Sequence, residues 1–234
     1  MTPTTHAERQ ALFSQFALVA DALAHGHRLS LLELLAQGER GVEVLAGFLG
    51  ISIASASQHL QKLKRAGLVV DRPEGRHRLY RLSGDQVSSL VLSLEKVAET
   101  SLASVEKLVH EQIRSRDGEP PIRARDLWAR LGKEPLVLID VRPAEEYRAG
   151  HLPGALHIPW ERLRHRPPEL PELPVDSMIV VYCRGPYCVL ALEALVSLRR
   201  LGYRVRRLEE GVPEWRRLGF PVEVEAPKAA EASG

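Results

Sequence analysis

Apolar and polar positions follow the period of an α-helix through the first part of the chain. The stretches 8–23 and 28–35 each carry apolar side chains on one face, and a break near Gly26 separates them. A shorter stretch of the same kind covers 42–49 and is followed by Gly50, a residue typical of helix C-termini. The pattern therefore predicts three helices in this region.

The next segment predicts a fourth helix followed by a β-hairpin. Ser52 can cap a helix that runs to about Ala66, and a glycine then ends it. Two short runs of strand-forming residues follow at 68–70 and 79–82, joined through a Pro-Glu-Gly turn. The order helix, turn, helix, hairpin indicates a winged helix-turn-helix.

One long helix is predicted from residue 84 to 113. About 28 residues at 1.5 Å each span roughly 40 Å, more than a small domain covers by itself. We therefore expect two copies of the chain to pair along this helix as a homodimer. A core helix packed within its own chain is the alternative. The apolar positions recur at intervals close to three and four: Val87, Leu90, Val91, Leu94, Val97, Leu102, Val105, Leu108 and Val109.

A change of composition divides the chain near residue 114. Residues 114–121 are polar and charged and end in two prolines, which predicts a linker. After it, apolar strand runs alternate with helices, as is typical of a parallel sheet with both faces covered. We predict a mainly α winged helix-turn-helix domain over 1–113, an α/β parallel-sheet domain over 122–223 and a disordered tail over 224–234.

Composition narrows the class of protein. The chain is 44% apolar and 26% charged, as soluble globular proteins are. No apolar run approaches the ~18 residues that a membrane helix needs, and the polar first ten residues do not resemble a signal peptide. We expect a cytoplasmic protein with no membrane partner.

Positive charge is concentrated around the fourth helix and the hairpin. Between Gln58 and Arg81, seven Lys or Arg side chains stand against two acidic ones, a local charge of +5 that is typical of a nucleic-acid-binding face. In a helix-turn-helix the second helix enters the major groove of double-stranded DNA. We expect DNA contacts from Ser52, Ala54, Ser55, Ser57, Gln58, His59, Lys62 and Arg65 on the helix, and from Arg76, His77 and Arg78 on the wing.

The segment 45–82 resembles the winged helices of the ArsR (arsenic-repressor) family of bacterial regulators. The likeness is carried above all by Ser57-x-His59-Leu60-x-x-Leu63 and by the Ala-Gly-Leu-Val that begins at Ala66. It implies a homodimeric repressor that binds an inverted repeat in operator DNA.

A metal site is not expected from this resemblance. Metal-sensing members carry cysteines on the short helix before the turn, where this chain has Val-Glu-Val-Leu at 42–45, or ligand clusters on the last helix. His25 and His27 read as helix-end or surface residues. We therefore predict neither a metal nor another cofactor. The acidic and histidine residues near the long helix do not form a convincing ligand set: Asp85, Glu106, His110 and Glu111.

Two cysteines, Cys183 and Cys188, are the only ones in the chain. An apolar strand, 178–183, delivers the first to its C-terminal end, and a helix over 189–201 begins directly after the second. Backbone amides and the positive end of that helix can stabilise a thiolate, the form that attacks sulfur or carries it as a persulfide. The spacing indicates chemistry or sensing, where a structural cysteine would otherwise be the default.

The second half resembles a single rhodanese domain over about 121–222. The matching stretches are LIDVRPAEEYRAGHLPGALHIPW, VVYCRGPYC and LEEGVPEWRRLGFPV, in the family's order and spacing. The resemblance implies that Cys183 is the nucleophile and persulfide carrier, and that Asp140 and Arg142 anchor the fold. The loop is one residue shorter than that of related phosphatases and arsenate reductases, which argues against phosphatase chemistry. The sulfur-binding loop would consist of Arg184, Gly185, Pro186, Tyr187 and Cys188.

One departure from the rhodanese pattern affects the expected chemistry. Many active rhodaneses have a basic residue at the sixth loop position, where this chain has Cys188. Losing that charge argues against efficient turnover of anionic thiosulfate. The added thiol could attack a persulfide on Cys183 and form a disulfide or a sulfur-bridged pair; equally, it could face the hydrophobic core.

Two functional hypotheses follow. In the first, the protein is a DNA-binding regulator whose rhodanese-like domain senses a small sulfur species at Cys183. In the second, it is a sulfurtransferase that the winged helix localises or dimerises.

Overall fold

The computed structural model describes residues 6–165 and 177–225. They form two compact units, divided between Glu95 and Lys96, and each is described by itself. Most of the predicted tail, residues 226–234, lies outside the described residues. No helix in the described part of the chain is both long and apolar enough to cross a membrane.

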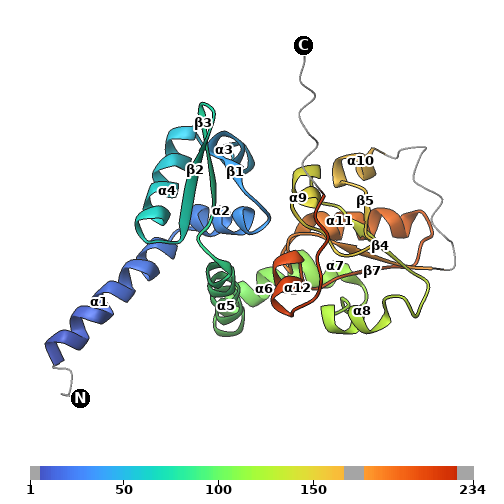
Figure 1. The fold of residues 1–234 in the computed structure, drawn as a ribbon. Coiled ribbons are helices and arrows are strands. Elements are labelled where there is room, and N and C mark those ends of the chain that lie inside the picture. Colours follow the sequence, from blue (N-terminus) through green and yellow to red (C-terminus); the bar gives the residue numbers. More distant parts are fainter. Residues whose placement is uncertain (1–5, 166–176, 226–234) are drawn as a thin grey trace, which may run out of the picture. The chain divides into compact units, whose positions relative to one another are not determined.

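The first unit contains the predicted helices. Ser52 caps the fourth of them, because its hydroxyl accepts a hydrogen bond from the Ser55 amide at 3.1 Å. Gly50 ends the third with a left-handed φ of 64°, which glycine adopts without strain. The helices are α1 (His6–Leu23), α2 (Gly26–Ala36), α3 (Val42–Leu49) and α4 (Ile53–Arg65) (Figure 1).

The predicted hairpin is present, and its strands are longer than the apolar runs suggested. Strands β2 (Val69–Glu74) and β3 (His77–Leu82) pair in antiparallel register around Gly75, whose φ is 59°. A two-residue strand, β1 (Arg40–Gly41), adds to the other side of β3 and was not predicted. Helices α2 and α4 contribute the centre of the apolar core of this unit through Leu31, Leu32, Leu60 and Leu63.

The prediction of one continuous helix over 84–113 is wrong at Leu102. Helix α5 (Asp85–Ser101) ends there, because Leu102 has extended dihedrals, and α6 (Ala103–Val109) begins after it. The break keeps its hydrogen bonds: the Leu102 amide donates to Ala98, and its carbonyl accepts from Val105. A π-turn, η1 (His110–Arg114), and a short α7 (Ser115–Asp117) then carry helical structure into the predicted linker.

The second unit is a parallel four-stranded sheet with helices on both faces, as predicted. Its strands are β4 (Leu136–Asp140), β5 (Leu156–His157), β6 (Met178–Tyr182) and β7 (Val205–Arg207), in the order β5-β4-β6-β7 (Figure 1). Alternate strand residues enter two separate apolar clusters. One cluster includes α10 (Trp160–Arg164) and α11 (Val189–Arg200), and the other includes α8 (Ala124–Arg130) and α12 (Val212–Arg217). A further helix, α9 (Ala144–Ala149), follows β4.

Candidate functional site

The cysteine loop lies between the end of β6 and the start of α11, as the sequence pattern predicts. Cys188 occupies the N-cap position of α11. The two cysteines are joined by a disulfide, and their Cα atoms are 6.2 Å apart. Cys183 is 2% exposed and Cys188 8%, and both belong to the apolar cluster on the α11 face of the sheet. Both alternatives for Cys188 therefore apply together: it faces the core and it pairs with Cys183.

The loop is closed on itself in this disulfide form. The Cys188 amide donates to the Gly185 carbonyl at 3.2 Å, so this amide is directed at the loop backbone. The cradle of amides around a Cys183 thiolate therefore stays a prediction for the reduced form. Almost none of the Cys183 side chain meets solvent, so a small molecule could contact it only after the loop opens.

Arg184, the first residue after Cys183, is held by a buried carboxylate. Its Nη2 donates to Glu146 Oε1 at 2.7 Å, and its Nε lies within 3.1 Å of both carboxylate oxygens. Glu146, on α9, is fully buried. This bidentate ion pair fixes the start of the loop, and the Glu146 carboxylate balances the positive charge of Arg184.

A second carboxyl lies against the middle of the loop. A Cβ built on Gly185 would come within 3.2 Å of Glu214 Oε1, and Glu214 Oε2 accepts from the Gly211 amide at 3.0 Å. Burial raises the pKa of Glu214 to about 7. Gly211 itself packs so closely on the Arg184 carbonyl that a side chain there would overlap it. A group that titrates near neutrality therefore lies beside the cysteine loop.

The last part of the loop contacts the helical connector, by which we mean residues 96–117: the end of α5, α6, η1 and α7. Arg207 Nη1 donates to the Pro186 carbonyl at 3.3 Å while Nε and Nη2 bind both oxygens of the buried Asp117 at 2.9 and 2.8 Å. Asp117 ends α7. The position of Pro186 is therefore coupled to the end of this connector.

Tyr187 makes a second contact between the loop and the helical connector. Its hydroxyl donates to Glu99 Oε2 at 3.1 Å, and Glu99, near the end of α5, also pairs with Arg114 and Lys96. Burial alone raises the pKa of Glu99, but the Tyr187 hydrogen bond and the two cations outweigh it and hold the pKa below its usual value. Glu99 is therefore a charged anchor for the loop.

Asp140 and Arg142 have the geometry of a structural anchor. Both side chains are fully buried, and Arg142 Nη2 donates to Asp140 Oδ2 at 2.6 Å and to the Gly150 carbonyl at 2.7 Å. This pair connects the end of β4 to the segment after α9.

In the first unit, the residues expected to contact DNA lie on α4 and the tip of the wing. Ala54 and Gln58 are exposed, Ser55 and Ser57 are half-buried, and Ser52 serves as the helix cap. His59 is half-buried and its imidazole faces the start of α2. The contact of these side chains with DNA remains a prediction. Further along α4 and on the wing, four of the expected residues are exposed: Arg65, Arg76, His77 and Arg78.

Much of the local positive charge has acidic partners. Lys62 pairs with Asp21 at 2.8 Å, and Lys64 and Arg78 both pair with Asp71. The hydrogen bond from Lys64 is the main cause that lowers the pKa of Asp71. The surface is therefore less positive than the count of Lys and Arg alone suggested. Similar pairs join Arg72 and Arg81 to Glu39.

The residues that support the cysteine loop could not be predicted from the sequence pattern. Glu146, Glu214 and Arg207 come from three different elements, and only the folded sheet brings them together. One signal was available: an acidic residue in the Glu-Glu-Tyr segment after Asp140 falls on the buried side of a short helix, where a charge needs a partner.

These two sites and folds define a class of protein: a DNA-binding winged helix-turn-helix joined to a rhodanese-like domain. Residues 23–72 match the family model of a helix-turn-helix domain, and residues 123–218 match that of a rhodanese-like domain. The chain belongs to the family of HTH-type transcriptional regulators of the ArsR type that carry a rhodanese-like domain.

A relative of this architecture is the HTH-type transcriptional regulator Rv0324 of Mycobacterium tuberculosis, 44% identical over 94% of this chain and 95% of its own length. A sulfurtransferase of Allochromatium vinosum is 33% identical over 38% of this chain and 79% of its own length. A solution structure of a homodimeric winged helix-turn-helix domain from Mycobacterium bovis is 42% identical and covers 44% of this chain and 95% of its own, with a TM-score of 0.41.

Proposed function

We propose that this transcriptional regulator is a cytoplasmic repressor that binds an inverted repeat in operator DNA as a homodimer and responds to reactive sulfur at Cys183. The observation that carries the sulfur assignment is the second thiol: Cys188 lies close enough to Cys183 for the two to bond. Two thiols at the end of the central strand of a rhodanese-like domain can react with sulfane sulfur and become a disulfide, which is a stable change in their oxidation state.

The chemistry has two balanced steps. The Cys183 thiolate attacks the outer sulfur of a persulfide R–S–SH; the S–S bond to R breaks, and RS⁻ leaves with the electron pair. The Cys188 thiolate then attacks the inner sulfur of the Cys183 persulfide, forms the disulfide and expels HS⁻. The two thiols are oxidised and the sulfane sulfur is reduced to sulfide.

The contacts around the loop could transmit the oxidation of the two thiols to the helical connector. Pro186 is held by Arg207 and Asp117, and Tyr187 by Glu99. Glu99 and Asp117 belong to helices α5 and α7. Opening the loop to admit a donor would break these contacts and release the helical connector.

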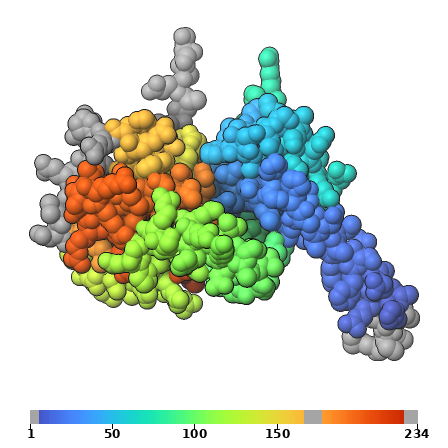
Figure 2. Space-filling view, turned by 180° about the vertical axis from the view of Figure 1, so that it is seen from behind, coloured from blue at the N-terminus to red at the C-terminus, as the bar shows by residue number. Residues whose placement is uncertain are grey.

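Exposed apolar side chains support the homodimer. On α5 and just beyond it, Leu90, Leu94, Val97 and Leu102 are 39–59% exposed. Helix α1 extends away from the rest of its own unit (Figure 2). Side chains of this kind on two helices favour burial against a second copy. The exposed apolar residues of α1 are Leu12, Phe13, Phe16 and Leu18.

Sulfurtransferase activity is the second candidate, supported by the similarity to the Allochromatium vinosum protein. The loop geometry favours sensing over turnover. Cys183 is buried, and the charge of Arg184 is already balanced by Glu146, so an anionic donor gains little attraction there.

DNA binding with and without sulfur tests the regulator. The reduced chain would first select its operator from a random DNA pool, and affinity would then be measured before and after treatment with polysulfide. We expect treatment to change the operator affinity of the wild-type protein at least about tenfold, which is ~1.4 kcal/mol. Cys183→Ser should bind the operator as the reduced protein does and show no change.

Cys188→Ser is the matched variant. It should gain the mass of one sulfur atom at Cys183 but retain it, because no second thiol expels the sulfide. A Cys183→Ser protein that responds like the wild type would refute sulfur sensing at this residue.

Rapid thiocyanate production from thiosulfate and cyanide, lost in Cys183→Ala, together with no sequence-selective DNA binding, would favour the enzyme.

A further inference from the structure

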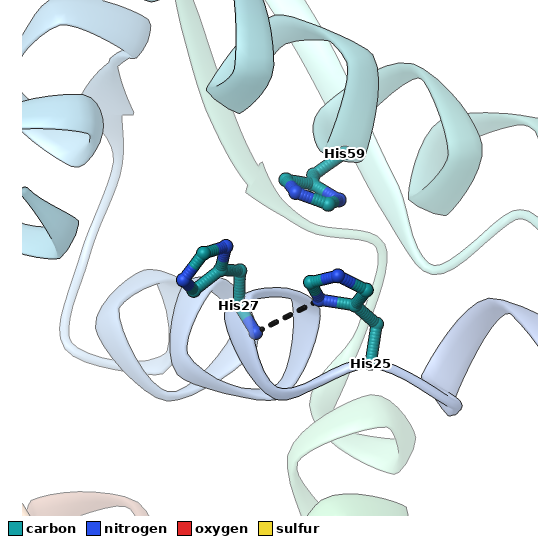
Figure 3. A group of neighbouring side chains, drawn as sticks. All are labelled: His25, His27 and His59. Atoms are coloured by element: carbon teal, nitrogen blue, oxygen red, sulfur yellow. Dashed lines mark hydrogen bonds between the residues drawn. The ribbon is translucent and has the colours of Figure 1, made fainter. Parts of the chain in front are cut away.

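Three histidines meet in the first unit, and none of them belongs to the cysteine loop. His25 lies immediately before α2, His27 is the second residue of α2, and His59 lies on α4 (Figure 3). One ring nitrogen of each can be chosen so that all three lie within 4.8 Å of one another. The ring of His59 is 4.5 Å from that of His25 and 5.5 Å from that of His27, between centroids. The cluster could not be foreseen from spacing along the chain, because its third member belongs to a different helix from the other two.

The chemistry of the cluster fits a metal ion better than another ligand. Neutral imidazoles bind zinc, copper and nickel, and three of them make up the protein share of many four-coordinate sites. Burial is the largest of the causes that lower the pKa of His59. A lowered pKa favours the neutral imidazole, which is the form that coordinates a metal.

We propose that His25, His27 and His59 form a binding site for a divalent transition-metal ion of the zinc class, which links the DNA-reading helix α4 to the start of α2. Zinc–nitrogen bonds of about 2.0–2.1 Å in a tetrahedral site place ligand nitrogens about 3.4 Å apart. The three nitrogens already lie within 4.8 Å. Small rotations of three side chains that are exposed or half-buried therefore close the site.

One existing interaction changes when the metal binds. His25 Nδ1 now accepts a hydrogen bond from the His27 amide at 3.2 Å and so caps α2. Coordination through Nδ1 replaces that bond, and coordination through Nε2 places the proton on Nδ1 and ends it. Arg28 opposes the metal by its charge, although its guanidinium is held by the carbonyls of Ala22 and Asp21. Metal binding therefore remodels the start of α2.

Metal binding at this site would give the first unit a second ligand-binding site, separate from the cysteine loop. His59 is among the side chains expected to contact DNA, and a coordinated His59 is withdrawn from that role. The site uses none of the residues of the cysteine loop, so it can be tested without reference to sulfur sensing.

Zinc titration of the full chain, in a Cys183→Ser/Cys188→Ser background that removes the thiols, tests the proposal. We expect one zinc ion per chain and a higher melting temperature of the first unit when zinc is present. His25→Asn is the most informative variant, because asparagine still caps α2 but offers no imidazole. His27→Asn and His59→Asn should lose binding as well, each by more than the roughly 10–100-fold that loss of an outer partner costs.

His110→Asn removes a histidine of the second unit and is the matched control. It should bind zinc with the affinity of the background protein. Zinc binding that survives His25→Asn and His27→Asn unchanged, or that is lost equally in His110→Asn, would overturn the proposal. Circular dichroism checks the folding of each variant; if His59→Asn does not fold, the other two variants decide the outcome.

Discussion

At the scale of single residues, Glu214 is an ionisable group in surroundings that favour its neutral form. It lies beside Gly185, it is 6% exposed, and burial raises its pKa from 4.5 to about 7. An acid with a higher pKa in the folded state binds more protons when folded. The stability of this unit should therefore fall as pH rises from about 4.5 to about 7, and stay constant above.

Glu214→Gln should remove that pH dependence. The full loss in the wild type is about 3 kcal/mol, from 1.36 kcal/mol per unit of pKa. We expect the variant to be more stable than the wild type at about pH 8 and to resemble it near its unfolded pKa of about 4.5. Urea unfolding at the two pH values measures both. Glu145→Gln, at a mostly exposed position on α9, is the control, and the same pH slope in all three proteins would contradict the assignment.

Single residues also mark the limit of prediction from sequence. The places of Cys183 and Cys188, after a strand and before a helix, could be predicted because these elements are consecutive in the chain. The pairing of Glu146 with Arg184 and of His59 with His25 and His27 could not be predicted, because the partners come from distant segments. The order of residues within a short segment predicts which residue ends a strand, whereas the pairing of side chains from distant segments depends on tertiary packing.

At the scale of elements, the contact between α12 and the cysteine loop depends on Gly211. Gly211→Ala would drive a methyl group into the Arg184 carbonyl, and Gly185 N would lie 2.9 Å from it. We expect a cost of at least about 1–3 kcal/mol, because backbone cannot rotate away as a side chain can. All three tryptophans lie after residue 95, so fluorescence-detected urea unfolding reports this unit.

Gly47→Ala is the matched substitution in the other unit. Gly47 is an exposed position within α3, and nothing lies within 4 Å of an added Cβ. Alanine there should stabilise the first unit by roughly 0.5–1 kcal/mol and leave the fluorescence transition in place. Equal transitions for Gly211→Ala and the wild type would show that the loop accommodates the methyl group.

Element prediction succeeded where periodicity was long and failed where elements were short. Helices α1 to α4 and strands β4 and β6 follow from clear patterns. Strand β1 has two residues and α8 has seven, too few to show a period. The break at Leu102 was missed because the apolar spacing continues across it, while the backbone changes direction.

At the scale of the whole molecule, the apolar face of α5 leads to a prediction about assembly. Leu94 is 39% exposed in the single chain. If α5 forms the dimer interface, Leu94→Glu buries a charge at the contact of two copies and should weaken the dimer at least about tenfold. Sedimentation equilibrium measures the change, and operator affinity should fall with it.

Val224→Glu is the control for this experiment, because Val224 is 65% exposed and lies far along the chain from α5. It should dimerise as the wild type does. A Leu94→Glu protein with unchanged dimerisation would exclude this face as the interface.

The ion pair between Arg184 and Glu146 has a consequence for ligand choice. Arg184 is the only cationic side chain among the six residues from Cys183 to Cys188, and its partner carboxylate is fully buried. The positive charge next to Cys183 is thus balanced within the folded protein. If Cys183 accepts sulfur as proposed, this balance should favour neutral and singly charged persulfides over doubly charged oxyanions of sulfur, because no unbalanced positive charge of the loop attracts a dianion.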